Sequence, residues 1–298
     1  MKELSGKIFY FLIASATFLI VLMLALILGN IFYFGKDRLS WEFLTAAPDQ
    51  GMTAGGIFPA IYGTLLLVLL MTIAVVPIGV MVAIYLHEYS RKSSLFYRIT
   101  RQAVSNLAGV PSIVFGLFGL GFFVRFVGGG IDQVFYGGQL VFGQPAILWA
   151  ALTMAVLTLP VVILTTEDTL RAIPNEMREA SMALGATKQQ TILRTVLPQA
   201  LPGILTGGIL AVSRGAGEVA PVLFTGAAYF LPQLPTQLNS QFMHLGYHTY
   251  VLSTQSPDVE ATKPILYSTV FVLLALTFIL NLLAIFIRSH VRGRLQQL

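Results

Sequence analysis

The sequence has 298 residues, of which 56% are hydrophobic and only 10% are charged, and its formal net charge is +5. An ordinary soluble domain carries about 25% charged residues, so this composition excludes a soluble globular protein and is typical of a membrane protein. The sequence contains no cysteine, which excludes disulfides and thiolate metal sites.

Long uncharged runs predict the membrane-spanning helices, because a helix needs about 20 consecutive apolar residues to cross a bilayer core. The first run, 8–35, is too long for the apolar core of a cleaved signal peptide and is expected to be a retained helix. Further crossings are predicted, in chain order, at 58–86, 104–125, 145–166, 200–228 and 265–287. The predicted fold class is an all-α membrane protein with six transmembrane helices.

The positions of Lys and Arg predict the orientation, because short cytoplasmic loops hold the excess of basic residues. Basic residues gather before the first predicted helix and after the second, fourth and sixth. This pattern places both termini in the cytoplasm. It also accounts for the positive net charge, because the basic residues lie in separate loops beside membrane helices, and no nucleic-acid partner is needed to explain them.

Sequence motifs for ATP binding and for metal binding are missing. No GxxxxGK[ST] loop occurs, so any energy from ATP must come from a partner. His244 and His248 are four residues apart, but the next acidic residue is Asp258, and no metal site is predicted there. Neither a metal nor another cofactor is expected.

The loop between the fourth and fifth predicted helices, 167–203, is the most patterned polar segment. Pro174 suits the first turn of a helix, 175–184 has an amphipathic pattern, and Gly185 is expected to end that helix. Thr187, with a Gln three residues later, predicts a capping box that opens a second helix. This pattern fits a loop that lies on lipid headgroups as well as one that projects toward a partner.

Within this loop, EASMALGATKQQTILRTVLP resembles the EAA signature of ABC importer permeases. Ser181 stands where that signature has its second Ala, and Thr195 stands where it has an Ile. The resemblance implies that 175–187 forms a coupling helix, which docks in a groove of a cytoplasmic ATP-binding subunit. The residues it assigns to ATPase coupling are Glu179, Ala180, Ser181, Gly185, Leu197 and Pro198.

Other stretches extend this resemblance to a narrower family. YLHEYS, NLAGVPSIVFGLFGLGFFV, SRGAGEVAPVLFTGAAYF and YHTYVLSTQSP are similar to the PstA family of permeases from phosphate-specific ABC importers. The resemblance implies a type I ABC importer permease fold in the bacterial inner (plasma) membrane, with transport rather than enzymatic activity. The alternatives are a permease for another oxyanion, such as sulfate or molybdate, and the sister permease of the same phosphate system.

The same resemblance implies the partners and the division of the chain. A homologous permease would form a heterodimer with this chain, two ATP-binding subunits would supply energy, and an external binding protein would deliver inorganic phosphate. Residues 1–57 are expected to form an N-terminal helix and external loop. Residues 58–290 would form the permease core, with 167–203 as its coupling loop, and 291–298 a cytoplasmic tail.

The fifth predicted helix holds two opposite charges, Arg214 and Glu218, about 40° apart on one helical face. Gly207, Pro221 and Thr225 are expected on that same face. A charge at the bilayer centre costs at least about 2.5 kcal/mol, so both side chains should face protein or water. Two interpretations stay open. The pair is either a self-satisfied packing clamp, or part of an anion path in which Arg214 binds phosphate and Glu218 weakens that grip.

The resemblance favours the anion path, because it assigns Arg214 and Glu218 to the substrate pathway. Small residues recur every four positions along this helix, at Gly203, Gly207, Ala211 and Gly215, which predicts close contact with a neighbouring helix. Gly215, Gly217 and Pro221 also predict a kinked or unwound segment beside the charges.

Two further features are open between a simple and a functional interpretation. Arg125 is typical of an anchoring residue at a helix end, with the outer vestibule as the alternative. Segment 229–263 is expected to form a short interfacial helix, or else a docking surface for an external binding protein.

A stand-alone secondary transporter is disfavoured, because no internal repeat is found and Glu218 is the one acid expected deep in a helix. An intramembrane enzyme is disfavoured because no helix supplies a catalytic constellation.

Overall fold

The computed structural model describes residues 2–49, 54–256 and 259–295. Over these ranges it has six helical spans long and apolar enough to cross a membrane. They are formed by α1 (Lys2–Gly35), α3 (Phe58–Ile84), α5 (Ser112–Phe118) with η4 (Gly119–Gly128) and α6 (Gly129–Phe135), α7 (Ile147–Ala172), α10 (Leu197–Gly217) and α13 (Val259–Leu295). The predicted number of transmembrane helices is therefore confirmed.

Shorter elements connect the spans. Between α1 and α3 lie η1 (Lys36–Arg38), α2 (Trp41–Thr45) and a two-residue antiparallel pair, β1 (Pro48–Asp49) with β2 (Ala54–Gly55). The others are η3 (Tyr85–Tyr89), α4 (Leu95–Ala108), α8 (Asn175–Ala183), α9 (Lys188–Thr191), η5 (Ile192–Val196), α11 (Ala220–Thr225) and α12 (Leu245–Thr254). The segments η3, η4 and η5 are π-helical.

The third span differs from its predicted bounds of 104–125. Residues Leu95–Ala108 form a separate amphipathic helix, α4, and the span itself runs from Ser112 to Phe135. Pro111 explains the boundary, because proline disfavours helical geometry in the residue before it and lacks the N–H that a continuous helix needs. At the other end of the chain, α13 continues to Leu295, so the expected tail from 291 begins inside a helix.

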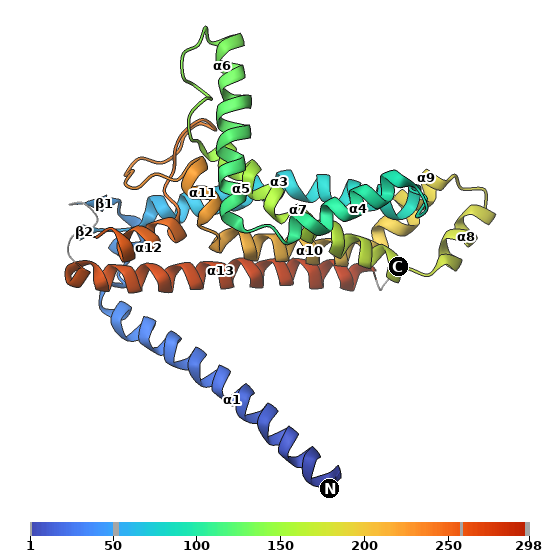
Figure 1. Ribbon diagram of the computed structural model, residues 1–298, viewed down its shortest axis with the longest axis horizontal. Helices are drawn as coiled ribbons and strands as arrows, with labels where there is room; N and C mark the ends of the chain where they lie inside the picture. Colours follow the sequence, from blue (N-terminus) through green and yellow to red (C-terminus); the bar gives the residue numbers. More distant parts are fainter. Residues whose placement is uncertain (1, 50–53, 257–258, 296–298) are drawn as a thin grey trace.

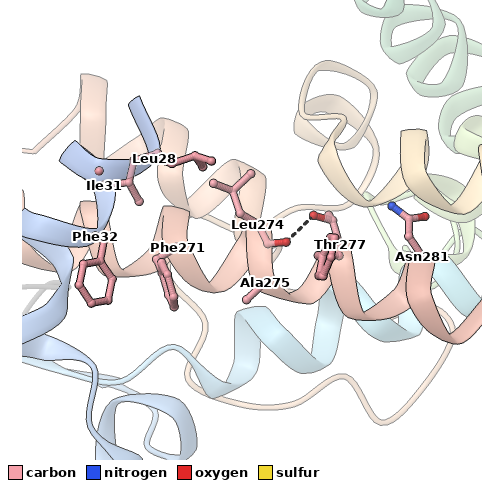
Figure 2. A pocket seen from close by; sticks show the side chains of 10 residues that line it. Leu28, Ile31, Phe32, Phe271, Leu274, Ala275, Thr277 and Asn281 are labelled. Carbon is pink, nitrogen blue, oxygen red and sulfur yellow. Dashed lines mark hydrogen bonds between the residues drawn. The ribbon is translucent and has the colours of Figure 1, made fainter. Parts of the chain in front are cut away.

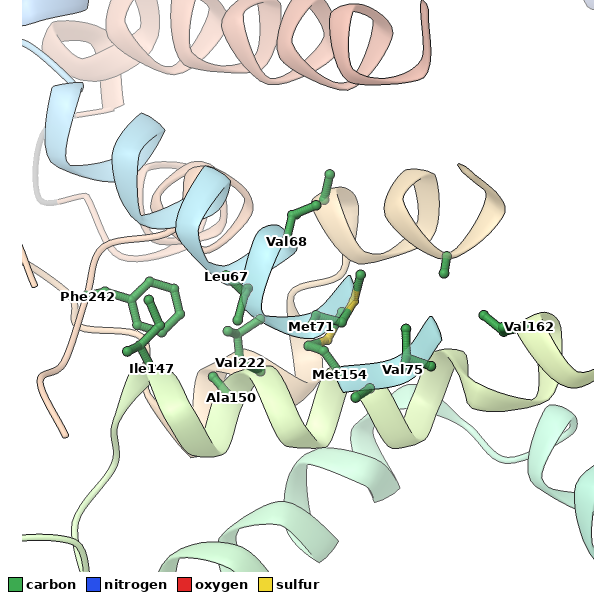
Figure 3. Close-up of a cluster of buried hydrophobic side chains, with 14 residues drawn as sticks. Leu67, Val68, Met71, Val75, Ile147, Ala150, Met154, Val162, Val222 and Phe242 are labelled. Atoms are coloured by element: carbon green, nitrogen blue, oxygen red, sulfur yellow. The ribbon is translucent and has the colours of Figure 1, made fainter. Parts of the chain in front are cut away.

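The hydrophobic core lies where α3, α7 and α10 meet. Leu67, Met71 and Val75 of α3 pack against Met154 of α7 and Ala211 of α10, and Figure 3 shows most of this cluster between the α3 and α7 ribbons. The most apolar window of the α7 span is 67% buried by protein, the highest share among the six spans. The central helix of this chain is therefore α7.

Two spans leave this central bundle. Figure 1 shows α1 running away from the bundle on one side, while the α5–η4–α6 span projects on the other. Near its C-terminal end α1 is held by α13, where Ser268 Oγ donates a hydrogen bond to the carbonyl oxygen of Gly35 at 2.6 Å. Most apolar side chains of α1 are therefore exposed.

Part of the segment between α11 and α13 is buried at the end of the bundle that carries β1, β2 and α12 (Figure 1). Phe242, Met243 and Leu245 are almost fully enclosed. The N–H groups of Ile147 and Leu148, which a helix start leaves unpaired, donate to carbonyl oxygens of this segment at 2.9 and 3.1 Å. The expected short helix exists as α12, and one side of it packs into the bundle through Leu245, Val251 and Leu252, whereas Tyr250 is exposed. Its interfacial position stays a prediction.

Candidate functional site

The fifth span is interrupted beside its two charges. Helix α10 ends at Gly217, Glu218 has an extended backbone (φ −76°, ψ 132°), and α11 starts at Ala220 with Pro221 in its first turn. Glycines weaken the last turn of α10, and Pro221 cannot donate a hydrogen bond back across the break. The predicted unwinding is confirmed.

Arg214 and Glu218 contact each other across this break. Arg214 Nε donates to Glu218 Oε1 at 3.2 Å, and the two side chains are 37% and 22% exposed. Among the described residues, neither Nη nitrogen of Arg214 has a hydrogen-bond partner. One edge of the guanidinium is thus held by Glu218, while the other edge can bind a further group.

The small residues of α10 bring this helix against its neighbours. A Cβ added to Gly203 or Gly207 would overlap Thr169 or Thr165 of α7, and one added to Gly215 would lie 2.6 Å from Met71 Sδ of α3. The predicted close contact is confirmed.

Neighbouring residues define the flank of α10 on which Arg214 lies. Ser213 Oγ donates to Asn281 Oδ1 of α13, so it points toward that helix. Because successive helical residues are about 100° apart, Arg214 lies on a flank between α13 and the α3–α7 pair. This flank is partly open in the isolated chain.

Gly207 shares the face of Arg214 as expected, because the two residues lie seven positions apart in the same helix, although this face is packed against α7 at the level of Gly207. The same expectation fails for Pro221 and Thr225, which are buried in the separate helix α11. A single helical projection does not reach them because the chain stops being one helix at Glu218.

The buried segment after α11 reaches this break. A Cβ on Gly246 would lie 3.0 Å from Val219 Cγ2, next to Glu218. His244 and His248 flank Gly246 and are almost fully buried. Burial lowers the pKa of each to about 4, so both imidazoles are neutral at pH 7. The described residues contain no group of three or more side chains suited to a metal.

The coupling loop has the predicted local structure, with one shift. Helix α8 is followed by Gly185, whose φ of +88° lies in the region that favours glycine. The capping box at Thr187 is present, with both hydrogen bonds made. Pro174 is the N-cap residue of α8 rather than a residue of its first turn.

The EAA-like residues divide between a solvent-facing helix and the start of the fifth span. Glu179 and Ala180 are exposed on α8, together with Met177 and Met182. Just beyond α8, Leu184 is 90% exposed. The loop therefore presents the apolar side chain of Leu184 and the carboxylate of Glu179 to the outside. Leu197 and Pro198 begin α10 and are partly buried.

The two departures from the EAA pattern contact each other. Ser181 Oγ lies 3.0 Å from Thr191 Oγ1, and Thr195 Oγ1 donates to Ser181 Oγ at 3.5 Å. These hydroxyls join α8 to α9 and η5. A hydroxyl at position 181 and a hydroxyl at position 195 therefore account for each other, because they hydrogen-bond together.

Sequence reasoning missed two ion pairs at the coupling-loop end of the bundle. Glu167, inside α7, is almost fully buried and pairs with Arg101 of α4. Glu88, in η3, pairs with Arg178 of α8 at 2.8 Å. Glu218 is thus not the only acid enclosed by helices. The signal was present as an acid at the end of each apolar run.

The chain was compared with known protein families and with individual proteins. The family described as "Binding-protein-dependent transport system inner membrane component" matches residues 75–297. "Phosphate transport system permease protein PstA 1" of Mycobacterium tuberculosis (strain CDC 1551 / Oshkosh) is 40% identical over 194 residues, which are 64% of this chain and 58% of that protein. "Phosphate transport system permease protein PstA" of Pasteurella multocida (strain Pm70) is 36% identical over 227 residues, 75% of this chain and 74% of that protein.

The aligned part spans about three fifths of the mycobacterial relatives, 58% of the M. tuberculosis protein and 62% of the PstA of Mycobacterium leprae. Among solved structures, a bacterial ABC transporter involved in alginate import has a TM-score of 0.64 at 15% identity, covering 97% of this chain and 99% of its own. The inward-facing MetNI methionine ABC transporter has a TM-score of 0.56 at 18% identity, covering 78% and 94%. These likenesses establish the predicted fold, that of a type I ABC importer permease.

Proposed function

This chain belongs to the family of inner membrane components of binding-protein-dependent transport systems, and is a multi-pass membrane protein; we propose that it is the permease subunit of an ATP-driven importer of inorganic phosphate. The observation that carries the proposal is the Arg214 guanidinium, held on one edge by Glu218 at a helix break inside a membrane span. The names of the relatives at 36% and 40% identity support phosphate as the anion.

The chemistry of Arg214 suits an anion that must bind and then leave. Its planar fork of donors matches two phosphate oxygens. Glu218 occupies Nε at 3.2 Å and leaves both Nη groups for the anion. At an effective dielectric of about 20, a negative charge about 5 Å from a carboxylate is destabilised by roughly 3 kcal/mol. Glu218 therefore keeps the site weak, as a transport path requires.

The open flank of α10 supports a second permease as a partner. Arg214 is 37% exposed in this chain although it lies within a predicted membrane span. Since a charged side chain in a bilayer faces protein or water, this flank needs a cover other than lipid. In our proposal a homologous permease supplies that cover, and the two chains form a heterodimer with one pathway between them.

The arm formed by α1 gives a second surface for that permease. A cleft of about 700 Å³ lies between α1 and α13, and its lining residues include Phe32, Phe271 and Leu274 (Figure 2). The hydroxyl of Thr277 in its wall donates to the Leu274 carbonyl oxygen at 2.9 Å. The cleft has no positive charge among its lining residues, so it suits an apolar helix and not the anion.

The coupling loop and the basic residues support the orientation. Arg178 of α8 and Lys188 of α9 contact Glu88 of η3, and Arg91 and Lys92 follow η3 directly, so all four lie at the end of the bundle that carries α8. In our proposal this end faces the cytoplasm, and an even number of spans then places both termini there. Two ATP-binding subunits dock at this end, one on each permease, and the apolar tip at Leu184 contacts one of them.

The proposed cycle follows from these positions. The ATP-binding subunits close on ATP and push the coupling helices, and the pathway changes from inward-facing to outward-facing. An external binding protein then delivers phosphate at the end that carries α12. On ATP hydrolysis the pathway faces inward again, and the weak Arg214 site releases the anion.

The experiment that tests the substrate measures uptake of labelled phosphate, sulfate and molybdate in cells lacking this chain. Loss of phosphate uptake alone, restored by the wild-type chain, is expected. Loss of sulfate or molybdate uptake with normal phosphate uptake would contradict the proposal. Restoration of uptake in cells that lack only the sister permease would instead assign this chain to the other position of the heterodimer.

A further inference from the structure

The YLHEYS stretch forms the coupling-loop end of the second span, and two basic residues of the coupling loop converge on it. In η3, Glu88 Oε1 accepts hydrogen bonds from Arg178 Nε at 3.2 Å and from Arg178 Nη2 at 2.8 Å. From the other side of the Gly185 turn, Lys188 Nζ donates to the Glu88 carbonyl oxygen and lies 4.9 Å from the centre of the Tyr89 ring.

Arg178 also joins this end of α3 to the end of α7. Its Nη2 donates to the Leu170 carbonyl oxygen at 2.9 Å, and its Nη1 donates to the Ile173 carbonyl oxygen at 2.7 Å. These are the carbonyl groups that the last turn of a helix leaves unpaired. One guanidinium therefore connects α8, α7 and η3 at the same time.

The enclosure of this pair makes the connection stiff. The Arg178 and Glu88 side chains are only 12% and 8% exposed, in contrast to the exposed Arg171–Asp168 pair nearby. A solvated ion pair contributes little to rigidity, whereas a charge-assisted, forked pair shielded from water fixes the geometry of both partners. The coupling loop therefore cannot shift without moving η3 or breaking this contact.

We propose that η3 is the socket through which the coupling loop drives the second span, with Arg178 and Lys188 as positioning residues that hold α8 on the ends of α3 and α7. Motion imposed on α8 then reaches the α3–α7 core as a rigid displacement, and is not absorbed by the loop. The inference rests on the proposed function in one respect, that an ATP-binding subunit moves α8.

The first test uses two conservative variants, Arg178→Lys and Glu88→Gln, in the complete purified complex in liposomes. Lysine keeps the charge but cannot make the forked contacts, and glutamine keeps the acceptor oxygen but loses the charge. The matched control is Arg171→Gln, in the exposed pair with Asp168 near the C-terminal end of α7. The number of ATP molecules hydrolysed per solute transported is expected to rise at least tenfold in both variants and to stay at the wild-type value in the control.

Two outcomes would overturn the proposal. A wild-type ratio in both variants would mean that the contact is dispensable for transmission. Loss of subunit assembly in both would mean that the contact serves assembly and not transmission.

A second test does not depend on the transported solute. Because the chain has no cysteine, spin labels at Lys92→Cys and Gln189→Cys are unique within it, and partner subunits made cysteine-free complete the design. In an otherwise wild-type chain the distribution of distances between the two labels is expected to be the same with and without ATP, and in Arg178→Lys it is expected to broaden. A distance that changes with ATP in the wild-type chain would overturn the proposal. If the wild-type complex neither hydrolysed ATP nor transported phosphate, the proposed function would fail instead.

Discussion

Gly185 gives a clean test of the coupling turn, because the structure separates backbone strain from steric clash. Its φ is +88°, and an added Cβ would meet nothing within 4 Å. Gly185→Val therefore acts through the backbone alone. Left-handed geometry costs an L-residue about 1–2 kcal/mol, which lowers the ratio of native to non-native turn by a factor of about 5–30. We expect the complex to assemble, while less phosphate is transported per ATP hydrolysed.

The control for this variant is Gly137→Val. Gly137 also has a positive φ, +59°, and open space around its Cβ position, but it lies in the loop after α6, far in sequence from the coupling loop. The two variants carry similar strain, and only Gly185→Val should uncouple transport. Gly185→Asp should also uncouple, more than Gly185→Asn, because it adds a negative charge at the C-terminal end of α8. Normal coupling in Gly185→Val, or equal loss in Gly137→Val, would refute this account of the turn.

Two further predictions concern packing and pH. Gly207→Ala should destabilise the purified complex by roughly 1–3 kcal/mol, seen as a lower thermal midpoint, because the added Cβ would overlap Thr165. Gly208→Ala is the control, because its Cβ would meet nothing closer than 3.5 Å and should leave the midpoint unchanged. Equal midpoints for the two variants would contradict the packing of α10 against α7. The segment holding His244 and His248 should lose stability as pH falls from 6.5 to about 4, since unfolded imidazoles take up protons in that range and the buried ones do not. Hydrogen exchange of α12 measures this, and a flat pH profile would count against it.

Features set by local chemistry were predictable from the sequence. The six spans follow from runs of apolar residues, and the Thr187 capping box and the Gly185 stop follow from residues a few positions apart. The break at Glu218 follows from Gly217 and Pro221, whose effect on a helix is intrinsic.

Features set by contacts between distant segments were not predictable. Arg178 and Glu88 are 90 positions apart, and no periodicity links them. The start of α12 is held by Thr64 of α3, whose hydroxyl oxygen accepts the Leu245 N–H at 2.9 Å, and the two residues are 181 positions apart. The start of the third span was misplaced because 104–108 is uncharged and so did not interrupt the predicted run, although α4 ends just before Pro111.

The assignment of Arg214 and Glu218 to a substrate pathway remains a prediction, and so does the assignment of Glu179, Ala180, Ser181, Gly185, Leu197 and Pro198 to ATPase coupling. The structure adds a geometric reason for the first, since Arg214 keeps its Nη groups available on a partly open flank. If the pair were only a packing clamp, Arg214 would need to contact Glu218 and nothing else, and its available Nη groups would have no role.

The most direct test of the central claim is labelled phosphate uptake by cells carrying Arg214→Gln, with Arg98→Gln on the exposed face of α4 as the matched control. Both variant complexes should assemble with their ATP-binding subunits, because among the described residues the Arg214 side chain hydrogen-bonds only to Glu218. The account predicts that Arg214→Gln abolishes phosphate uptake and that Arg98→Gln retains it. Normal uptake by Arg214→Gln would contradict the anion path and leave Arg214 and Glu218 as a packing clamp.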